Sequence, residues 1–273
     1  MEASTRTEPL TNRVARPALG VVSEVGDLLG FGGRAILHAA GAWRYFAEIL
    51  RQCSILVLGT TVIVSALVMV VGGECSLFEV YLLRPIGGTS LIGFPTMICG
   101  LREMWPYMFG YIFAAKVGCG LVAEIGSMRI NEEIDALESQ GVDPMSYIVA
   151  SRLLAVWMVV PFMYLLAMVF GTIGSFLVAT VQFGEVTRGQ FSALFFGTQP
   201  VIDNLFSLIK AVSFATVIAI VGMYYGYRAR GGPVGVGDAT ARSMIANLIL
   251  IHVVGSVLSA LFWGTRARIP FGG

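Results

Sequence analysis

The stretch "GVGD" at residues 235–238 has the residue types of an intramembrane aspartyl protease. That chemistry needs two aspartates close enough to share one proton. No Tyr-Asp pair lies in a preceding apolar stretch, and Asp238 falls in a polar segment beside Arg242. The sequence therefore disfavours a protease. It favours a tight glycine turn, with Asp238 as a candidate cap for the helix that follows.

Charged residues inside apolar stretches are the second group that could do chemistry, because a charge in the bilayer is costly and is usually functional. Asp203 and Lys210 share one helix face two turns apart, about 10 Å, which is too far for a direct pair. Lys210 can either snorkel toward the interface or bond the carbonyls of a neighbouring helix, and we expect its role to be structural. The full set is Arg102, Glu103, Lys116, Asp203 and Lys210.

Histidines form no relay in this sequence. His38 precedes the first long apolar stretch, and His252 stands alone in the last one. A proton-driven carrier needs a chain of acids and histidines across the membrane, so this class is disfavoured. We expect His252 to be a satisfied core histidine.

Nucleotide and metal sites also lack their residues. Neither Lys116 nor Lys210 has the glycine before it and the Ser or Thr after it that a P-loop requires, so this chain is not expected to hydrolyse ATP. The cysteines have no CxxC spacing, and we expect small core residues, not a metal site or a disulfide framework. They are Cys53, Cys75, Cys99 and Cys119.

The segment "RINEEIDALESQGVDP", residues 129–144, concentrates acidic side chains in a chain that has few. Asn131 can cap a helix, two glutamates follow it at the positive end of the helix dipole, and Gly141 provides a stop. This pattern predicts a helix of about ten residues. Ile134 and Leu137 would form an apolar edge suited to a partner protein. A solvated helix that merely joins two spans is the alternative.

The composition identifies the class of protein that must position these residues. The chain is 56% hydrophobic and only 13% charged, with a mean hydropathy of +0.79. A soluble domain cannot cover its surface with so few charges, so we predict a membrane protein. The net charge of +1 gives no field for holding nucleic acid.

Five apolar stretches are long enough to cross a bilayer as helices. They lie near 54–73, 104–127, 149–180, 201–227 and 243–264. Residues 86–101 are apolar but short and interrupted by glycine and proline, so we expect a half-span or re-entrant piece. The fold class is therefore an all-α integral membrane protein with five transmembrane helices, forming a single domain over 23–265.

Residues 23–52 mix charges with apolar side chains at helical spacing and are too polar to cross. They predict an amphipathic interfacial helix on the cytosolic leaflet, or an amphipathic helix packed on other protein. Residues 1–22 lack the apolar core of a signal peptide and are expected to be a flexible cytosolic N-terminus. Five spans then place residues 266–273 outside as an extracytoplasmic tail.

The arginines support this orientation. With the N-terminus inside, the connections 128–148 and 228–242 are cytosolic, and 74–85 and 181–200 are extracytoplasmic. Most arginines fall on the cytosolic side, as the positive-inside rule expects. Those outside are Arg84, Arg188, Arg266 and Arg268.

Small residues on the second span should allow close helix contact. The segment "GCGLVAEIG" places them on faces where backbones can touch. We expect helix packing at Gly118, Gly120 and Gly126, and a surface where subunits slide against each other is the alternative.

The run "AKVGCGLVAEIGSMRINEEIDALESQGVDP", residues 115–144, resembles the signature of the MlaE/YrbE permeases, which are membrane subunits of ABC-type lipid transporters. "LREMWP" (101–106) is similar to that family's R-E-x-x-P element, and "SLIKAVSFATVIAIVGMYYGY" (207–227) resembles its fourth span. "YYGYRARGGPVGVGDATARSM" (224–244) looks most like the B-type YrbE paralogues of actinobacterial Mce systems. The resemblance covers most of residues 25–265.

The resemblance implies that the acidic helix over 131–141 is a coupling helix seated in a groove of the ATP-hydrolysing subunit. It also implies that Arg102 and Glu103 border a lipid pocket between two permease subunits, where we place Leu67 and Val70 as well. A structural charge pair at a helix end is the alternative for the first two. The implied coupling residues are Glu132, Glu133, Asp135, Ala136, Leu137 and Gly141.

These expectations combine into a non-catalytic permease subunit of an ATP-driven Mce/Mla-type lipid transporter in the cytoplasmic membrane, with import as the implied direction. A fatty acid, sterol, mycolate or phospholipid would suit an apolar cavity. The implied partners are a second YrbE-type permease, a cytosolic P-loop ATPase dimer that binds ATP and Mg²⁺, and extracytoplasmic Mce-type lipid-binding proteins. The rivals are a stand-alone carrier or channel and the GxGD protease.

Overall fold

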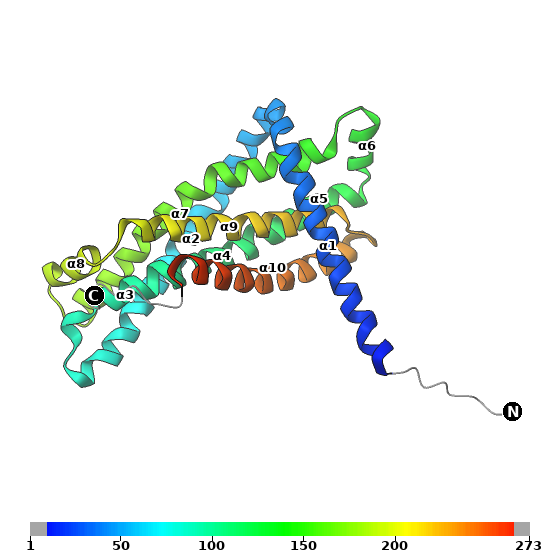
Figure 1. Cartoon of the computed structure of the whole chain (residues 1–273). Coiled ribbons are helices and arrows are strands. Elements are labelled where there is room, and N and C mark those ends of the chain that lie inside the picture. Colours follow the sequence, from blue (N-terminus) through cyan, green and yellow to red (C-terminus); the bar gives the residue numbers. More distant parts are fainter. Residues whose placement is uncertain (1–9, 265–273) are drawn as a thin grey trace.

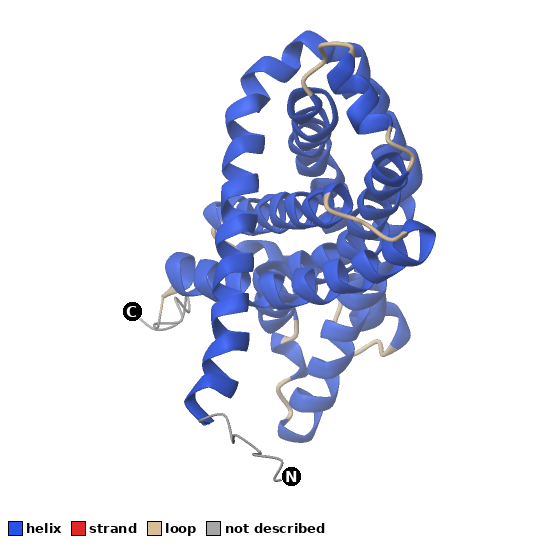
Figure 2. Ribbon diagram, turned by 90° about the vertical axis from the view of Figure 1, so that its right-hand side faces the viewer, coloured by secondary structure: helices blue, strands red, loops and turns tan. Residues whose placement is uncertain are grey.

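A computed structural model describes residues 10–264, and this part of the chain is helical apart from short turns, with no strand (Figure 2). Five helices in the described residues are long and apolar enough to cross a membrane, which confirms the all-α membrane fold class. Their bounds are Ser23–Ile86, Thr89–Ile130, Met145–Gln182, Val201–Tyr227 and Gly232–Trp263.

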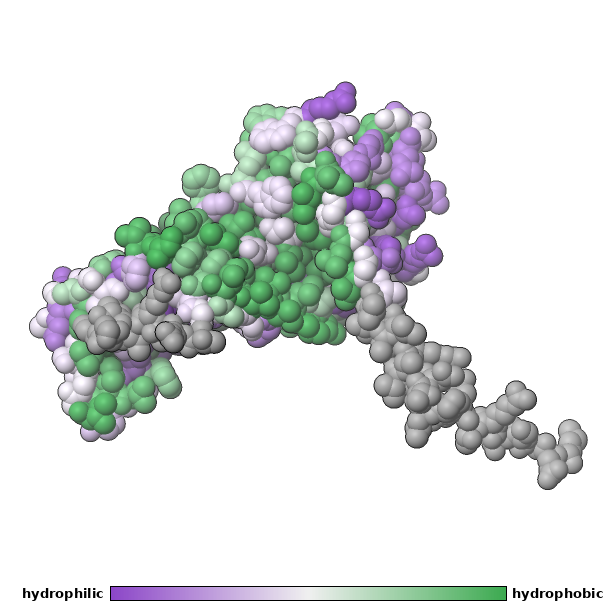
Figure 3. Space-filling view, in the orientation of Figure 1, coloured by the Kyte–Doolittle hydropathy of each residue, from purple (hydrophilic) through white to green (hydrophobic). Residues whose placement is uncertain are grey.

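Hydropathy divides the visible surface as a bilayer would require. Apolar side chains form a broad band over the middle of the bundle, and hydrophilic residues gather at the end that carries helix α6 (Glu133–Ser139) (Figure 3). Large apolar side chains such as Leu58, Val62 and Phe162 are 84%, 76% and 74% exposed. Exposure of such a broad apolar surface is unfavourable in water and favourable in the hydrocarbon layer of a membrane.

The first two helices meet at a short 3₁₀ turn. Helix α1 (Leu10–Ala42) runs obliquely past the ends of other helices (Figure 1), and η1 (Trp43–Tyr45) leads into α2 (Phe46–Leu83). The expected interfacial segment 23–52 is therefore divided, because residues 46–52 already belong to the first spanning helix. The helix also begins at Leu10, inside the expected flexible segment 1–22. Residues 1–9 and 265–273, with the tail at 266–273, lie outside the described residues.

Glycines bring α2 and α7 (Ser151–Leu177) together. A Cβ added to Gly72 would lie 2.0 Å from the carbonyl oxygen of Gly171, and one added to Gly174 would lie 1.9 Å from that of Met69. The Ser175 hydroxyl donates a hydrogen bond across this contact to the Gly72 carbonyl (2.8 Å). Backbone-to-backbone packing of this kind holds membrane helices together where water cannot drive them.

The second span contradicts the expected re-entrant piece at 86–101. Short turns η2 (Arg84–Ile86) and η3 (Thr89–Leu91) precede a helix that continues without interruption to Ile130. Pro95 lies in the first turn of this helix, where a missing N–H breaks no helical bond. The pieces are α3 (Gly93–Met97), η4 (Ile98–Met104, a π-helix), α4 (Trp105–Phe113), η5 (Ala114–Gly118, a π-helix) and α5 (Cys119–Ile130).

Cys75 and Cys99 form a disulfide between α2 and η4, which corrects the expectation of unpaired core cysteines. The sequence argument failed because it treated residues 86–101 as a separate half-span. Once that segment is the start of the second helix, it runs back beside α2. Cys53 and Cys119 are free and half-buried.

The remaining helices complete the bundle. The third span joins two π segments, η6 (Met145–Ala150) and η7 (Val178–Gln182), to α7. The connection expected at 181–200 contains helix α8 (Arg188–Gly197), whose Phe191 and Phe195 are buried. The last two spans are α9 (Val201–Tyr227) and α10 (Gly232–Trp263).

The expected glycine turn near 231–239 is shorter than predicted. Gly231 and Gly232 have positive φ values of 87° and 70° and make the turn, after which α10 begins. Asp238 therefore lies inside the helix, where it pairs with Arg242 one turn later (2.8 Å). It is not a cap.

Candidate functional site

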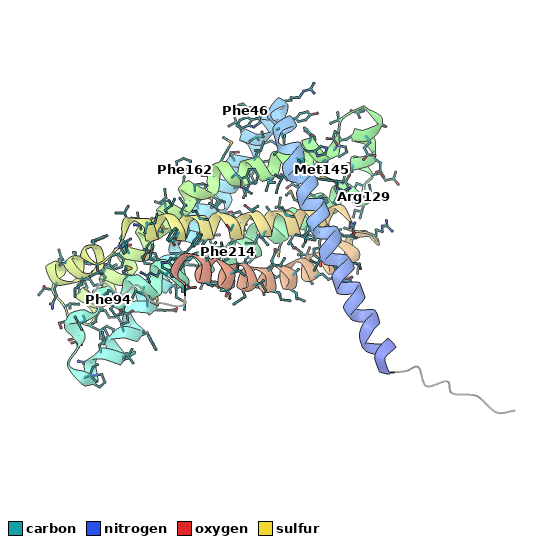
Figure 4. All side chains as sticks on the ribbon, viewed as in Figure 1. Phe46, Phe94, Arg129, Met145, Phe162 and Phe214 are labelled. Carbon is teal, nitrogen blue, oxygen red and sulfur yellow. A yellow bond between two sulfur atoms is a disulfide. The ribbon has the colours of Figure 1, made fainter. Side chains whose placement is uncertain are left out.

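Helix α6 sits at the polar end of the bundle, between α5 and η6. Arg129, near the end of α5, precedes it in the chain, and Met145, at the start of η6, follows it; both lie at the end of the bundle that carries α6 (Figure 4). The predicted cap is wrong: Asn131 ends α5, with its N–H bonded to the Ser127 carbonyl (3.1 Å). Glu132 instead makes the turn with a positive φ of 59°, so α6 is shorter than the ten residues expected.

The two faces of α6 differ from the prediction. Ile134 is completely buried, and Leu137 is half-buried against the core of the same chain. The apolar edge expected to meet a partner is thus used to fix α6 to its own spans. Exposed side chains remain at Glu132, Glu133, Asp135, Ala136 and Glu138. The surface that α6 presents is acidic, with the small Ala136 opposite Ile134 on the helix.

Both ends of α6 are fixed. At its start, Arg129 pairs with Asp135 (2.7 Å). At its end, the Gly141 N–H bonds the Glu138 carbonyl (3.0 Å) and the Val142 N–H bonds that of Leu137 (3.1 Å). These two bonds, with Gly141 at φ 77°, make a Schellman motif. The predicted stop at Gly141 is confirmed.

Asp143 caps the helix that follows α6. Its carboxylate accepts hydrogen bonds from the backbone N–H groups of Met145 and Ser146, both at 3.1 Å, and from the Ser146 hydroxyl at 2.6 Å. Burial alone would raise the pKa of Asp143, but these hydrogen bonds, together with nearby His38, outweigh it and lower the pKa. The hydrogen bonds of Asp143 therefore fix the turn that joins α6 to the third span.

Arg102 and Asp203 form a buried ion pair near the opposite end of the bundle. The Arg102 Nη2 lies 2.8 Å from the Asp203 Oδ2, and both side chains are less than a tenth exposed. The Trp263 indole N–H donates to the other Asp203 oxygen (3.0 Å). Helices η4, α9 and α10 are joined at this point.

Glu103 and Lys210 form a second pair beside the first. The Lys210 ammonium donates to Glu103 (2.7 Å), to the Ser259 hydroxyl (2.7 Å) and to the Arg102 carbonyl (3.1 Å). Of the two arrangements open to Lys210, the structure has the bond to a neighbouring helix carbonyl, and the buried side chain does not snorkel. The sequence analysis did not predict that Arg102 and Glu103 each pair with an opposite charge on α9. One signal for it was present in the sequence: one span carries an adjacent Arg and Glu, and another carries an Asp and a Lys.

The expected pocket residues do not meet in one place within this chain. Val70 is 57% exposed and lines an apolar groove of about 350 Å³ between α2 and the α7–η7 helix, with Glu74 and Gln182 also on its wall. Leu67 is exposed but does not line this groove, and neither do Arg102 and Glu103.

Two of the three predicted packing glycines lie at helix contacts. Gly118 meets α9, because a Cβ on Gly222 would lie 2.8 Å from the Gly118 carbonyl oxygen. A Cβ on Gly126 would lie 3.0 Å from Val236 of α10. Gly120 has nothing within 4 Å of the position of its absent Cβ, so it faces outward and packs on no helix in the described part of this chain. The alternative of a contact between subunits stays a prediction for this residue.

His252 differs from the core histidine that we expected, because its side chain is exposed. It is nevertheless satisfied: Nδ1 lies 2.9 Å from the Leu248 carbonyl, and Nε2 lies 2.9 Å from the Tyr111 hydroxyl. Among the described residues, no group of three or more His, Cys, Asp or Glu side chains could hold a metal ion.

Comparisons with known proteins agree with this arrangement. The chain matches the family model of the permease MlaE over residues 49–261. It is 26% identical to a probable ABC transporter permease protein of Rickettsia felis over 93% of this chain and 98% of that protein. It is 31% identical to a probable ABC transporter permease protein of Synechocystis over 66% of this chain and 68% of that protein. Since the matched region includes all five spans from within α2 onward, together with α6, the chain belongs to the MlaE permease family.

Proposed function

We propose that this chain is one permease subunit of an ATP-driven lipid transporter. It would lie in the inner membrane, with its N-terminus in the cytosol. The observation that carries this proposal is α6: an acidic helix, exposed on one side and fixed to two spans on the other. Homologues named as ABC transporter permeases support it.

In this proposal α6 seats on a P-loop ATPase dimer, which binds ATP and Mg²⁺ and does the hydrolysis. Exposed Glu132, Glu133 and Asp135 would meet basic groups of that partner, and Ala136 would allow close approach. Buried Ile134 would then transmit the displacement to the spans, because a packed core moves with the helix it anchors. This chain itself would perform no catalysis.

A second YrbE-type permease would complete the lipid pocket bordered by Arg102, Glu103, Leu67 and Val70. Mce-type lipid-binding proteins would dock outside. Of the two connections expected outside, 74–85 is largely helical here. We therefore propose docking at the exposed turn Arg84–Ile86 and the 181–200 connection beside it, which the Arg84–Glu185 pair joins (3.0 Å). Import is the direction we propose, with a fatty acid, sterol, mycolate or phospholipid as cargo.

The proposal is tested by co-purification in mild detergent. The variant Ala136→Arg places a bulky cation at the exposed tip of α6 and leaves the buried Ile134 untouched. Its matched control is Ala241→Arg, at an exposed position on α10. A P-loop ATPase should purify with the wild type and with the control, and its yield with Ala136→Arg should fall about tenfold or more, as expected when an interface loses 1.4 kcal/mol.

Two outcomes contradict the proposal. Absence of any ATPase beside intact, monodisperse wild-type protein would favour a stand-alone carrier or channel. Equal ATPase yield with both variants would show that α6 does not form the contact.

A further inference from the structure

Lys116 is a charge inside a spanning helix that the chain leaves unpaired. Its side chain is exposed, and among the residues that the structure describes no carboxylate or hydrogen-bond acceptor contacts it. The helix from Gly93 to Ile130 is about 57 Å long, and Lys116 lies about 35 Å from its start. A hydrocarbon layer of about 30 Å centred on this helix would contain Lys116 in its cytosolic half. An ion there costs about 2.5–3.5 kcal/mol unless something neutralises it.

Lys116 lies in the π-helix η5 (Ala114–Gly118), which follows α4 directly and packs against α10. The wider π turn changes the direction of the side chains it carries relative to those of α4. The residue of α4 that contacts α10 beside this segment is Tyr111. Tyr111 in turn bonds His252 of α10 (2.9 Å). Since the Nδ1 of His252 must donate to the Leu248 carbonyl, its Nε2 accepts the Tyr111 proton.

These groups continue a polar edge that rises to the buried charge cluster. The Tyr107 ring lies 5.5 Å from that of His252, and the Lys210 ammonium lies 4.6 Å from the Tyr107 ring. The Ser259 hydroxyl on α10 closes the path by donating to Glu103 (2.7 Å). Lipid tails cannot form hydrogen bonds to such an edge. Of the five spans, α10 is the one least covered by the rest of the chain, because only 17% of its apolar stretch is buried.

The charges on this edge select the kind of group that would occupy it. Glu103 is neutralised by Lys210, and both ring nitrogens of His252 have hydrogen-bond partners within the chain. Lys116 therefore contributes the one uncompensated charge of the edge among the described residues. The ligand that matches this charge is an anion. A lipid can carry an anion to this depth because its acyl chains partition into the hydrocarbon layer.

We propose that Lys116 is the counter-charge for the anionic headgroup of the transported lipid, a carboxylate or a phosphate, which moves along the edge formed by Lys116, Tyr111 and His252 while its acyl chains stay in the membrane. This inference rests on the proposed function and narrows its substrate class. It places the headgroup against one chain's second span and α10, rather than in the groove lined by Val70.

The test is lipid selectivity of the purified full-length chain, without ATPase. Protein is equilibrated with equal amounts of phosphatidylglycerol and phosphatidylcholine, or of oleate and phosphatidylcholine, and the retained lipids are counted by native mass spectrometry. The variants are Lys116→Gln and Lys116→Met, which suits a lipid-facing position and so should fold. Lys116→Arg keeps the charge, and Arg44→Gln removes an exposed arginine elsewhere.

We expect wild type, Lys116→Arg and Arg44→Gln to retain anionic over zwitterionic lipid, and both neutral variants to lose that preference by about three- to tenfold. Loss in the phosphatidylglycerol arm alone identifies an anionic phospholipid headgroup, whose phosphate has no neutralising choline, and loss in the oleate arm alone identifies a carboxylate. An unchanged preference in the neutral variants overturns the proposal. If the neutral variants keep the preference but dissociate from a dimer to monomers, the proposal is also overturned, and Lys116 belongs to a contact between subunits. Neither result affects the co-purification test of the proposed function.

Discussion

The Arg102–Asp203 pair joins three helices at a place where neither charge can reach water. Removing one partner of a buried pair leaves the other charged and unsolvated. We predict that Asp203→Ala lowers the free energy of unfolding by about 3–5 kcal/mol. Unfolding in detergent micelles measures this. The control Asp238→Ala breaks an exposed pair and should cost less than about 1 kcal/mol; equal losses in the two variants would show that the buried pair is not a structural contact.

Asp143 should make stability depend on pH in a defined direction. Its pKa is lowered below the ordinary value of 3.8 in the folded chain, so it stabilises the fold above that value. This contribution is lost as the pH falls through the lower, folded pKa. Asp143→Ala should therefore cost about 1 kcal/mol at neutral pH. The gap between variant and wild type should close in acid, as measured by unfolding across pH. A gap that widens in acid would contradict the capping role.

Single residues show how far sequence reasoning reaches. Each intramembrane charge was recognisable as costly, and the bond from Lys210 to a carbonyl was one of the two arrangements predicted. The pairing of Arg102 with Asp203 was not, because the partners are separated by a hundred positions and adjacent residues on a helix point in different directions. Burial of Ile134 was likewise missed, since an apolar edge looks the same whether its partner is another protein or the same chain.

At the scale of elements, the contact between α2 and α7 depends on the absence of side chains. Gly72→Ala and Gly174→Ala each place a methyl group against backbone, which cannot move aside as a side chain can. We predict a loss of about 1–3 kcal/mol or more for each variant. Gly120→Ala is the control: it meets nothing within 4 Å, so helix propensity should make it neutral or slightly stabilising. Thermal unfolding of the three variants should separate them, and a destabilised Gly120→Ala would contradict the outward placement.

The elements themselves were predictable where apolar length decides them. All five predicted spans coincide with helices of the structure, apart from residue 264, one position past the end of α10, because about 20 apolar residues can only be a helix in a bilayer. The ends were less predictable. Gly93 and Pro95 suggested an interruption, yet a proline in a first turn is compatible with a helix. Gly235 and Gly237 suggested a turn, yet the positive φ values fall at Gly231 and Gly232.

For the whole molecule, the Cys75–Cys99 disulfide provides a test of orientation. Disulfides persist on the oxidising side of a membrane, so this pair should face outward if the N-terminus is cytosolic. In intact cells carrying Cys53→Ser and Cys119→Ser, an impermeant maleimide should label the chain only after an impermeant reductant. Labelling that appears only after the membrane is permeabilised would reverse the proposed orientation.

The distribution of charge over the whole chain is consistent with that orientation, since arginines gather at the end that carries α6. The sequence alone could not reveal the polar edge at Lys116. Its meaning depends on how two helices, distant in sequence, place their exposed residues side by side.

The most direct test of the central claim is ATP-driven lipid movement in proteoliposomes that contain the purified permease with its ATPase. We predict movement of a fluorescent lipid that requires ATP, is abolished by Ala136→Arg and is retained by Ala241→Arg. Lipid movement that is equally fast without ATP, or that Ala136→Arg leaves unchanged, would contradict a permease driven through α6.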